Sequence, residues 1–366
     1  MSPLRVAVTL EQCWHRVPGG TASSALGTIS ALRDRSDVEC IGVAACHRST
    51  PPEPWTPSIE TKHLRLRREV LYESWHRLRW PRVERATGRV DVIHATGMAI
   101  PPKSAPLAVT VHDLAFVDFP QHATRHGLRF FHRSLVLTDR DADVVLCPSA
   151  ATKAELAALG IGEDRVRVVP WGVDPFVVGD DDIARVRAGH GITGRYVLWV
   201  GTVEPRKNLA AVIAAFRALP DDDVTLLLVG PHGWNEDLAA RLGADDRRIR
   251  ALGFVSRENL LALYAGAAVF CYPSLREGFG IPVLEAMMAG APIVTSSGTA
   301  TEEVAGDAGI CVDPLDHGAI SDAMASILGD AALARRMSVR AKARAATFTW
   351  ARTAELTIEA YRAIAR

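Results

Sequence analysis

Two glutamates in one short run, REGFGIPVLE at 276–285, are spaced so that they could bind two sets of hydroxyl groups. A short apolar stretch precedes the run. Pro282 is well placed for the first turn of a helix, and Gly290 is well placed to end it. Glu277 would then lie in the loop and Glu285 one turn into the helix, so the two carboxylates would stand at different depths of one site.

The glycines of this run predict close contact between backbone and ligand. Gly278 and Gly280 allow a tight turn and a near approach of the main chain. Free N–H groups at the start of the helix, together with its dipole, favour an anion such as a diphosphate. The alternative is a glycine-rich turn before a core helix, with two ordinary surface glutamates. The glycines and the helix start favour the ligand site.

Adjacent cations occur in a second run, EPRKNL at 204–209, which follows another apolar stretch. Arg206 offers a planar fork and Lys207 a point charge, and both can meet a diphosphate. We expect the run to open a helix, where cations are unfavourable unless an anion accompanies them. This favours a ligand role over a solvated helix start.

Two further segments lie in the first half of the chain. His112 ends an apolar stretch and is predicted to point toward a ligand, although a lone histidine is often a core or capping residue. Asp113 could orient the imidazole or cap the next segment, and both readings stay open. Gly19 and Gly20 follow the first apolar stretch and allow a substrate to come close, or form a tight turn alone. They do not form the GxGxxG fingerprint, so NAD binding is not favoured.

Short apolar stretches alternate with amphipathic ones along the whole chain, which predicts βαβ units and parallel sheets covered on both faces. The series runs twice, separated by the linker-like run PWGVDP at 170–175. Ligands bind at the carboxyl ends of such strands, so a cleft between two domains is expected to hold the substrate. The predicted strands are Val6–Leu10, Cys40–Ala44, Val90–His94, Ala108–His112, Val144–Cys147, Val166–Val169, Tyr196–Val200, Thr225–Val229, Ile249–Ala251, Val269–Tyr272 and Ile293–Ser296.

Composition excludes several classes of protein. The 366 residues carry 42 Lys+Arg and 42 Asp+Glu, and zero net charge argues against a dedicated nucleic-acid binder. No apolar run approaches the length of a membrane-spanning helix, and the first residues do not resemble a signal peptide. Six scattered cysteines without a CxxC pair fit reduced thiols, so we expect a cytoplasmic protein. The acidic runs 180–182 and 221–223 are interpreted as solvated turns, and no metal site is expected.

One basic segment, residues 62–89, contains nine Lys and Arg against three Glu, with Trp75 and Trp80 interleaved. Such a segment could dock peripherally on an anionic membrane surface that carries a lipid-linked acceptor. The alternative is a solvated helix pair whose tryptophans pack inward.

Together these segments resemble the retaining glycosyltransferases of family 4, and the resemblance covers nearly the whole chain. The glutamate, seven-residue, glutamate spacing with GFG after the first is the hallmark of that family. EPRKNL and VHD at 111–113 resemble bacterial members that often act as mannosyltransferases. The resemblance implies the α/β GT-B architecture, with two Rossmann-like, doubly wound domains facing across a cleft. Residues 1–173 would bind the acceptor, 174–348 the nucleotide sugar, and 349–366 would form a helix that crosses back to the first domain.

Roles for individual residues follow from the same resemblance. Some members have an arginine where this chain has Thr202, so the cationic role is expected to rest on Arg206 and Lys207. Glu285 would bind the ribose hydroxyls, and His112 would lie beside the transferring sugar. Glu277 and the backbone of Phe279 and Gly280 would contact the donor sugar. The implied catalytic set is His112, Arg206, Lys207 and Glu277, and the implied donor-binding set is Gly19, Gly20, Thr202, Phe254, Val255, Phe279, Gly280, Ile281 and Glu285.

The implied reaction moves a hexosyl group, with mannose favoured, from a GDP- or UDP-linked donor to a hydroxyl of a glycan or lipid-linked saccharide. It keeps the anomeric configuration and needs neither a metal nor another cofactor. The alternative enzyme is a sugar-nucleotide epimerase of GT-B fold, which would lack the spaced glutamates and would convert the donor without an acceptor. A two-lobed solute-binding protein is a third reading, but it would need an export signal.

Overall fold

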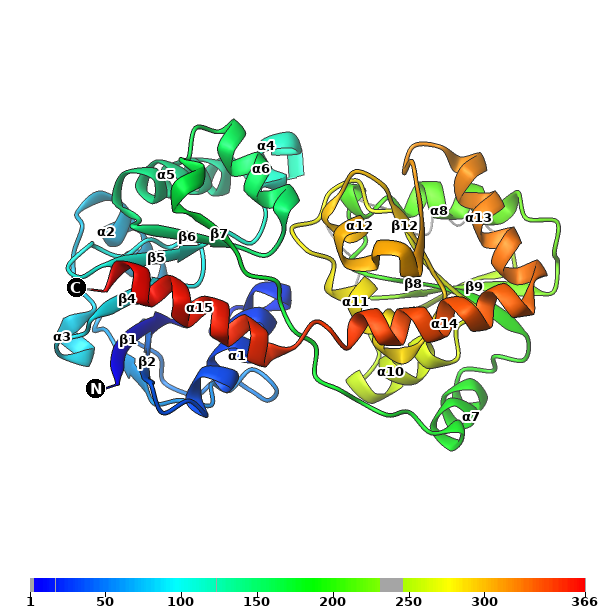
Figure 1. The fold of residues 1–366 in the computed structure, drawn as a ribbon, viewed down its shortest axis with the longest axis horizontal. Coiled ribbons are helices and arrows are strands. Elements are labelled where there is room, and N and C mark those ends of the chain that lie inside the picture. Colours follow the sequence, from blue (N-terminus) through cyan, green and yellow to red (C-terminus); the bar gives the residue numbers. More distant parts are fainter. Residues whose placement is uncertain (1–2, 17, 123, 231–245, 366) are drawn as a thin grey trace. The chain divides into compact units, whose positions relative to one another are not determined.

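The computed structural model describes residues 3–16, 18–122, 124–230 and 246–365, and the chain divides into two compact units (Figure 1). The first unit comprises Met1–Gly172 and Thr349–Arg366, and the second comprises Val173–Phe348. The expected boundaries were 173/174 and 348/349. The C-terminal helix therefore belongs to the first unit although it follows the second in sequence.

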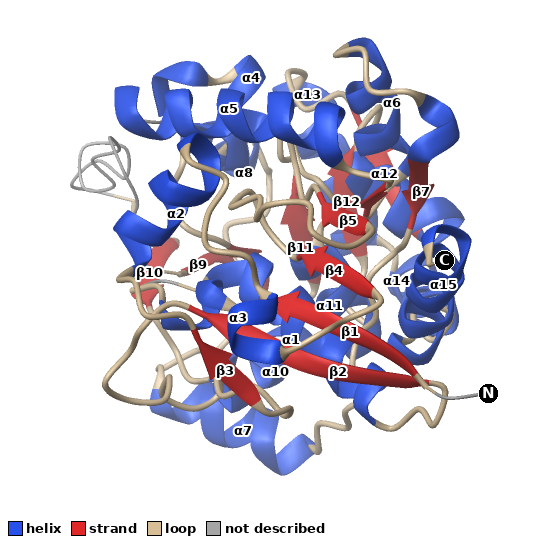
Figure 2. Ribbon diagram, turned by 90° about the vertical axis from the view of Figure 1, so that its left-hand side faces the viewer, coloured by secondary structure: helices blue, strands red, loops and turns tan. Residues whose placement is uncertain are grey.

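The described strands of the first unit form one parallel sheet in the order β3-β2-β1-β4-β5-β6-β7. Figure 2 shows β1, β2 and β3 side by side. The strand order reverses between β1 and β4, and such a reversal opens a crevice at the carboxyl ends of the strands. The strands are β1 (Leu4–Thr9), β2 (Val38–Ala44), β3 (Thr61–His63), β4 (Val92–Ala95), β5 (Leu107–Thr110), β6 (Val144–Cys147) and β7 (Val166–Val168).

Helices cover both faces of this sheet because successive strand residues alternate between two cores. Val6 packs in one core and Ala7 in the other, and Ala108 and Val109 divide in the same way. The core of Val6 also contains α1 and α15, whereas that of Ala7 contains α2, α5 and α6. The helices are α1 (Gly19–Arg33), α2 (Arg68–Arg77), α3 (Glu84–Thr87), α4 (Ala115–Asp118), α5 (Arg125–Asp141), α6 (Ala150–Ala158) and α15 (Trp350–Ile364), with 3₁₀ turns at Glu11–Trp14, Pro120–His122 and Glu163–Arg165.

The second unit repeats the design with the described strand order β10-β9-β8-β11-β12-β13, again parallel throughout. Its strands are β8 (Arg195–Val200), β9 (Val224–Val229), β10 (Ile249–Gly253), β11 (Val269–Tyr272), β12 (Ile293–Ser296) and β13 (Gly309–Val312). Its described helices are α7 (Asp180–Gly189), α8 (Leu209–Arg217), α10 (Arg257–Ala265), α11 (Ile281–Ala289), α12 (Ala300–Ala305), α13 (His317–Gly329) and α14 (Ala331–Ala345), with 3₁₀ turns at Pro205–Lys207 and Gly306–Ala308.

The predicted α/β class with two doubly wound parallel sheets is confirmed. Each predicted strand is present, with ends shifted by a few residues. The strand predicted at Ala108–His112 ends at Thr110, so His112 lies in the loop that follows. Two edge strands were missed, β3 and β13. β3 is three polar residues long and β13 is only partly buried, so neither gives the apolar run on which the prediction depended.

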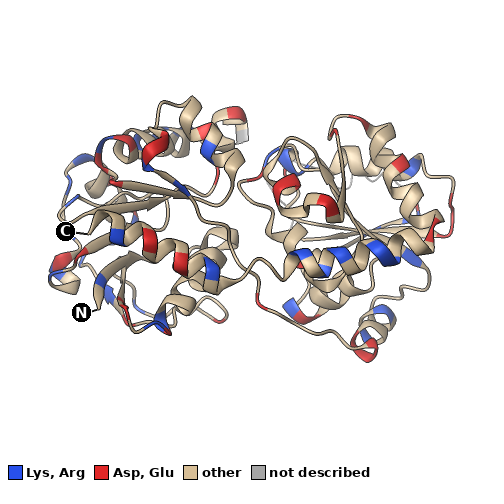
Figure 3. Cartoon of the chain, in the orientation of Figure 1, with Lys and Arg blue, Asp and Glu red and all other residues tan. Residues whose placement is uncertain are grey.

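Positive charge on the second unit is concentrated on α14, which carries five Lys and Arg residues (Figure 3). One of them, Arg344, donates from Nη2 to the carbonyl of Glu303 at 2.7 Å and from Nε to that of Val304 at 3.3 Å. These carbonyls end α12, and a cation there is favourable. Arg344 of this basic helix therefore has a structural role. Across the described residues, no helix has the length and apolar character to cross a membrane.

Candidate functional site

The loop between β11 and α11 is shaped by glycine. Gly280 caps α11 with φ 111°, and a Cβ there would lie 2.8 Å from Thr301 Cγ2, so a larger residue would be strained and crowded. Pro282 lies in the first turn of α11, and Gly290 ends it with φ 85°. The helix predicted from these residues is thus confirmed, and its N-terminal N–H groups follow directly on Gly280.

Glu277 is the centre of a buried polar cluster in this loop. Its side chain is 9% exposed. Oε1 accepts hydrogen bonds from Tyr272 Oη and Ser274 Oγ, each at 2.9 Å, and from Lys207 Nζ. Oε2 accepts from Arg206 Nη1 at 3.1 Å. The structure therefore brings three of the predicted catalytic residues together, and it adds Tyr272 and Ser274, which the sequence did not single out. We call these five residues the cation cluster.

Opposite charges stabilise one another in this cluster, although burial lowers the pKa of Lys207. Burial by itself would raise the pKa of Glu277, but Lys207 and Arg206 lower it to about 2. Arg206 has a second carboxylate partner, Glu204, whose Oε2 lies 3.0 Å from Nε. Lys207 Nζ also donates to Tyr272 Oη. Two cations and two carboxylates thus balance one another in a site where an unpaired charge would be costly.

Arg206 and Lys207 occupy a 3₁₀ turn, Pro205–Lys207, and not the first turn of an α-helix as we expected. Asn208 follows in a left-handed conformation (φ 56°), which separates this turn from α8. Asn208 Nδ2 donates to the carbonyl of Pro273 at 3.0 Å, and Leu275 N donates to that of Arg206 at 2.8 Å. The turn is therefore tied to the β11–α11 loop, which places both cations beside Glu277.

Glu285 forms a second ion pair on the same helix. It is 9% exposed, and Oε1 accepts from Arg257 Nη1 on α10. Burial raises the pKa of Glu285, and Arg257 opposes this. Sequence reasoning missed Arg257, because only the packing of α10 against α11 brings it to the carboxylate. Glu285 is thus held in place, but it lies in a cluster of its own.

An exposed aromatic side chain stands at the end of β10. Phe254 is 84% exposed and follows Gly253, which has φ 68°. Val255 beside it is partly buried. An aromatic face left in water is available to stack on a planar ligand.

The other predicted donor-binding residues differ in what they offer. Phe279 is 3% exposed and packs edge-on against Phe348 at 5.8 Å, so only its backbone could contact a ligand. Ile281 is partly exposed in the first turn of α11. Thr202 is partly exposed just after β8.

A cavity of about 240 Å³ lies at the carboxyl ends of β8, β9 and β10, with Trp199, Val203 and Gly253 among its lining residues. Gly230, at the end of β9, also lines it. A Cβ on Gly230 would lie 2.0 Å from the carbonyl oxygen of Gly201, so the two strand ends touch through their backbones. The cavity itself is large enough to admit part of a ligand.

In the first unit, His112 is held as a neutral imidazole. Its Nε2 lies 2.7 Å from the carbonyl oxygen of Thr96, which can only accept, so Nε2 carries the proton. Burial lowers the pKa of His112. Its Nδ1 is buried and has no hydrogen-bond partner among the described residues. Asp113 Oδ1 accepts from Ala115 N at 3.0 Å, so its observed role is to cap the next segment.

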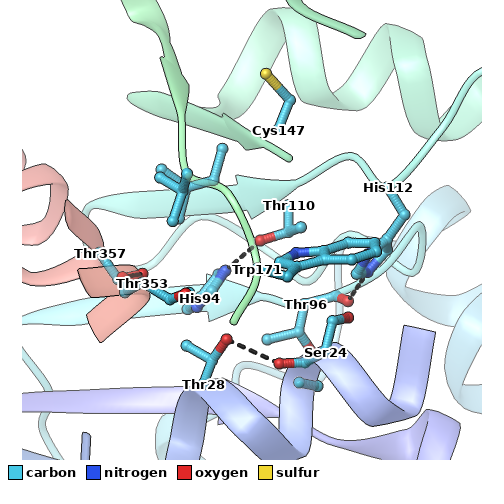
Figure 4. A pocket seen from close by; sticks show the side chains of 13 residues that line it. Ser24, Thr28, His94, Thr96, Thr110, His112, Cys147, Trp171, Thr353 and Thr357 are labelled. Atoms are coloured by element: carbon cyan, nitrogen blue, oxygen red, sulfur yellow. Dashed lines mark hydrogen bonds between the residues drawn. The ribbon is translucent and has the colours of Figure 1, made fainter. Parts of the chain in front are cut away.

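A small cavity of about 20 Å³ lies beside His112, large enough for one water molecule (Figure 4). His94 lines it and bonds Thr110 Oγ1 through Nε2 and Tyr361 Oη through Nδ1, both at 2.7 Å. Tyr361 belongs to α15. The C-terminal helix is thus joined to β4 and β5 by a buried polar contact.

A larger cavity of about 380 Å³ is also lined by His112. Its walls include Pro18 and Thr21, which flank Gly19 and Gly20 at the start of α1. Both glycines are exposed, and Gly19 has φ 62°. Of the predicted residues in this unit, His112 lines the cavity and the glycine pair lies at its edge.

Within the described residues there is no group of three or more His, Cys, Asp or Glu that could hold a metal ion. The acidic run 180–182 forms the first turn of α7, where carboxylates interact favourably with the helix dipole. Asp221 accepts from Arg195 and from the backbone N–H of Asp223. These carboxylates thus have local structural partners.

Comparison with known proteins identifies relatives across both units. A family model described as "Glycosyltransferase Family 4" matches residues 18–175, and one described as "Glycosyl transferases group 1" matches residues 181–344. The O-antigen chain mannosyltransferase B of Escherichia coli is 32% identical over 311 residues, which cover 81% of each chain. The serotype-specific mannosyltransferase WbdA of Escherichia coli is 30% identical over 280 residues, 72% of this chain but 34% of WbdA. The chain thus spans about a third of the length of WbdA.

A solved structure shares the fold at low sequence identity. Anabaena Alr3699/HepE, in complex with UDP and glucose, superposes with a TM-score of 0.76 and is 19% identical, with 98% of this chain and 100% of that chain covered. The fold described above is therefore shared over 98% of this chain.

Proposed function

Because the chain belongs to glycosyltransferase family 4 and has the GT-B fold of that family, we propose that it is a retaining, metal-independent hexosyltransferase that uses a nucleoside diphosphate sugar. The favoured sugar is mannose, since the relatives reported above are named mannosyltransferases. The donor is GDP- or UDP-linked, and the acceptor is a hydroxyl of a glycan or lipid-linked saccharide. No cofactor other than the donor substrate takes part.

The observation that carries this proposal is the pair of cations in the cation cluster. Departure of a nucleoside diphosphate leaves new negative charge on a phosphate oxygen. Lys207 is 8% exposed and Arg206 is held on two sides by carboxylates, so both charges are fixed before a ligand arrives. Fixed charge in a water-poor site is an effective way to stabilise a leaving group.

Glu277 gains a role in this proposal that differs from direct sugar contact. Its two oxygens are already bonded to Arg206, Lys207, Tyr272 and Ser274. We assign it the task of holding the two cations at the spacing that a diphosphate requires. A contact with the donor sugar, as the family resemblance implies, would use the lone pairs that these bonds leave.

The nucleoside would be held by the other predicted residues of the second unit. Glu285 would accept hydrogen bonds from the ribose hydroxyls while Arg257 keeps its side chain in place. Phe254, with its exposed ring, would pack against the nucleobase beside Val255. The backbone of Phe279, Gly280 and Ile281 would contact the donor, as would Thr202. The UDP in the HepE complex supports a nucleoside diphosphate as ligand.

The proposed chemical step is a displacement on one face of the sugar. The bond between the anomeric carbon and the diphosphate oxygen breaks, and the diphosphate takes the electron pair. The acceptor hydroxyl forms the new bond on the same face, and its proton passes to the departing diphosphate. In this step, Arg206 and Lys207 stabilise the charge that develops on the leaving group.

A thermal-shift screen with GDP, UDP and ADP sugars, followed by a transfer assay, tests the proposal. We expect one nucleotide to raise the melting temperature, and the matching sugar nucleotide to release its diphosphate only when a saccharide acceptor is added. Conversion of the donor sugar to its epimer without an acceptor would instead show an epimerase. Stereochemistry at the new linkage, read by NMR, decides between retention and inversion.

We further propose that the enzyme works in the cytoplasm and touches an anionic membrane through residues 62–89. All six cysteines are free, which suits a reducing compartment. Trp75 is 1% exposed and packs inward, whereas Trp80 is 44% exposed and Leu78 is 74% exposed. Arg85 lies over the Trp80 ring at 5.1 Å. The surface thus combines apolar and cationic side chains, as membrane-surface segments do.

Liposome co-sedimentation tests the membrane contact. We expect binding to vesicles that contain anionic lipid, weaker binding after Arg82→Gln and Arg85→Gln together, and no binding to neutral vesicles. A solvated surface would give equal, weak sedimentation with both kinds of vesicle.

A further inference from the structure

The 380 Å³ cavity of the first unit has one wall of aromatic rings, so we call it the aromatic cavity. We propose that it is a subsite for an uncharged sugar residue of the acceptor and that it rejects phosphorylated groups. This inference rests on the proposed function, which it deepens by naming the chemistry of the acceptor. The volume lies in the range of small-molecule sites.

The aromatic wall is pre-formed by ring contacts. Tyr72 stacks on Phe130 at 5.7 Å, and Phe116 stacks on Phe131 at 4.9 Å. Phe130 and Phe131 meet edge-on at 5.9 Å, so the two stacks form one surface. A pyranose ring has an apolar C–H face and a rim of hydroxyls, and aromatic side chains pack well against such an amphipathic shape.

Other lining residues of the cavity present hydrogen-bond acceptors. Gln12 donates from Nε2 to Thr96 Oγ1 at 2.7 Å, and its Oε1 has no partner among the described residues. Asp113 uses Oδ1 to cap Ala115, and among the described residues its Oδ2 has no partner. Glu11 also lines the cavity, but its carboxylate is already bonded by Ala45 N at 2.7 Å and by His47 Nε2 at 2.9 Å. Unused acceptors need O–H or N–H donors, and sugar hydroxyls supply them.

Charge in the aromatic cavity disfavours an anion. Among its described lining residues there is no Lys or Arg. Of its two histidines, His15 has a pKa lowered to about 4, by burial and then by Arg68, and His112 also has a lowered pKa because of burial. Both are therefore neutral near pH 7. A phosphate in this cavity would meet the carboxylate of Asp113 and that of Glu11, which is bonded to His47 Nε2, with no Lys or Arg among the described lining residues to offset them.

The test uses the full chain saturated with GDP or UDP. Saturation-transfer NMR compares methyl α-mannoside and methyl α-glucoside with mannose 6-phosphate. We expect at least one neutral probe to bind and the phosphorylated probe to bind about tenfold more weakly or not at all. Equal or tighter binding of mannose 6-phosphate, or no binding of either neutral probe, would overturn the proposal.

Variants then place the binding site. Tyr72→Ala removes one ring of the wall and should abolish the neutral-probe signal, with nucleotide affinity by calorimetry unchanged. Thr21→Arg puts a cation on the wall of the cavity and should shift preference toward mannose 6-phosphate, whereas Thr21→Gln, of similar reach but uncharged, should not. Neutral-probe binding that survives Tyr72→Ala places the sugar elsewhere and contradicts the proposal.

Failure of the proposed function gives a different result. If no nucleoside diphosphate binds in calorimetry but the neutral probe still binds without nucleotide and is lost in Tyr72→Ala, then the donor assignment is wrong and the subsite stands. If the nucleotide binds and the phosphorylated probe enters the cavity, the subsite assignment is wrong and the donor assignment stands.

Discussion

The cation cluster of the second unit and the aromatic cavity of the first differ in how their polar groups are paired. In the cluster, two cations and the buried Glu277 are joined by direct bonds, and every charge has a partner before any ligand arrives. In the aromatic cavity the histidines are neutral, and Gln12 and Asp113 each leave an oxygen without a partner among the residues that the structure describes. The first arrangement suits a charge that forms during a reaction, and the second suits a neutral ligand with many hydroxyls. Changes to the cluster should therefore alter turnover, and changes to the cavity should alter acceptor binding.

Loss of Lys207 is the largest expected effect. Lys207→Ala should reduce kcat by on the order of 10²-fold or more, because it removes one of two charges that stabilise the leaving diphosphate. Lys207→Arg is the matched control and should keep part of the activity. Steady-state kinetics together with nucleotide calorimetry separates turnover from binding. Wild-type turnover in the alanine variant would contradict the proposed role of Lys207 in stabilising the leaving group.

Low pH should destabilise the second unit because it protonates Glu277. The pKa of this carboxyl is lowered from 4.5 to about 2. The ionised form therefore adds stability that is fully present above pH 4.5 and is lost as the pH falls toward 2, on the order of 3 kcal/mol in all. Thermal denaturation of the wild type and Glu277→Gln between pH 7 and pH 2.5 measures it. The stability difference between the two proteins should shrink in acid, and a constant difference would contradict the pairing.

A smaller effect is expected at the second ion pair of the unit. Glu285→Ala should weaken binding of the nucleoside diphosphate about tenfold, since it removes an acceptor from the ribose hydroxyls. Arg257→Ala should give a lesser loss, because Arg257 only holds Glu285 in place. Calorimetry with GDP and UDP measures both. Unchanged affinity in Glu285→Ala would remove it from the donor site.

The smallest effect should come from the contact between α15 and β4 in the first unit. Tyr361→Phe deletes the hydroxyl that bonds His94 and should lower the free energy of unfolding by about 1 kcal/mol. Nucleotide affinity should stay at the wild-type value. Chemical denaturation measures the loss, and a change in nucleotide binding instead would show that this contact serves more than the docking of α15.

Local sequence patterns predicted much of the framework. Valine-rich runs marked the central strands of both sheets, since buried parallel strands need apolar residues on both faces. Pro282 and Gly290 marked the two ends of α11, because proline favours the first turn of a helix and glycine readily adopts the left-handed conformation that ends one. The same local logic failed at β3, whose polar residues at a sheet edge carry no such preference.

The sequence by itself thus determined the α/β class, the glycine-rich loop before α11 and the candidate charges at 206, 207, 277 and 285. Only the tertiary structure decided which charges meet. Lys207 and Glu277 are separated by 70 positions, and Arg257 and Glu285 by 28. Likewise, α15 reaches His94 across 267 positions. Hydrogen bonds between such distant residues depend on how whole strands and helices pack, which no local preference of a residue encodes.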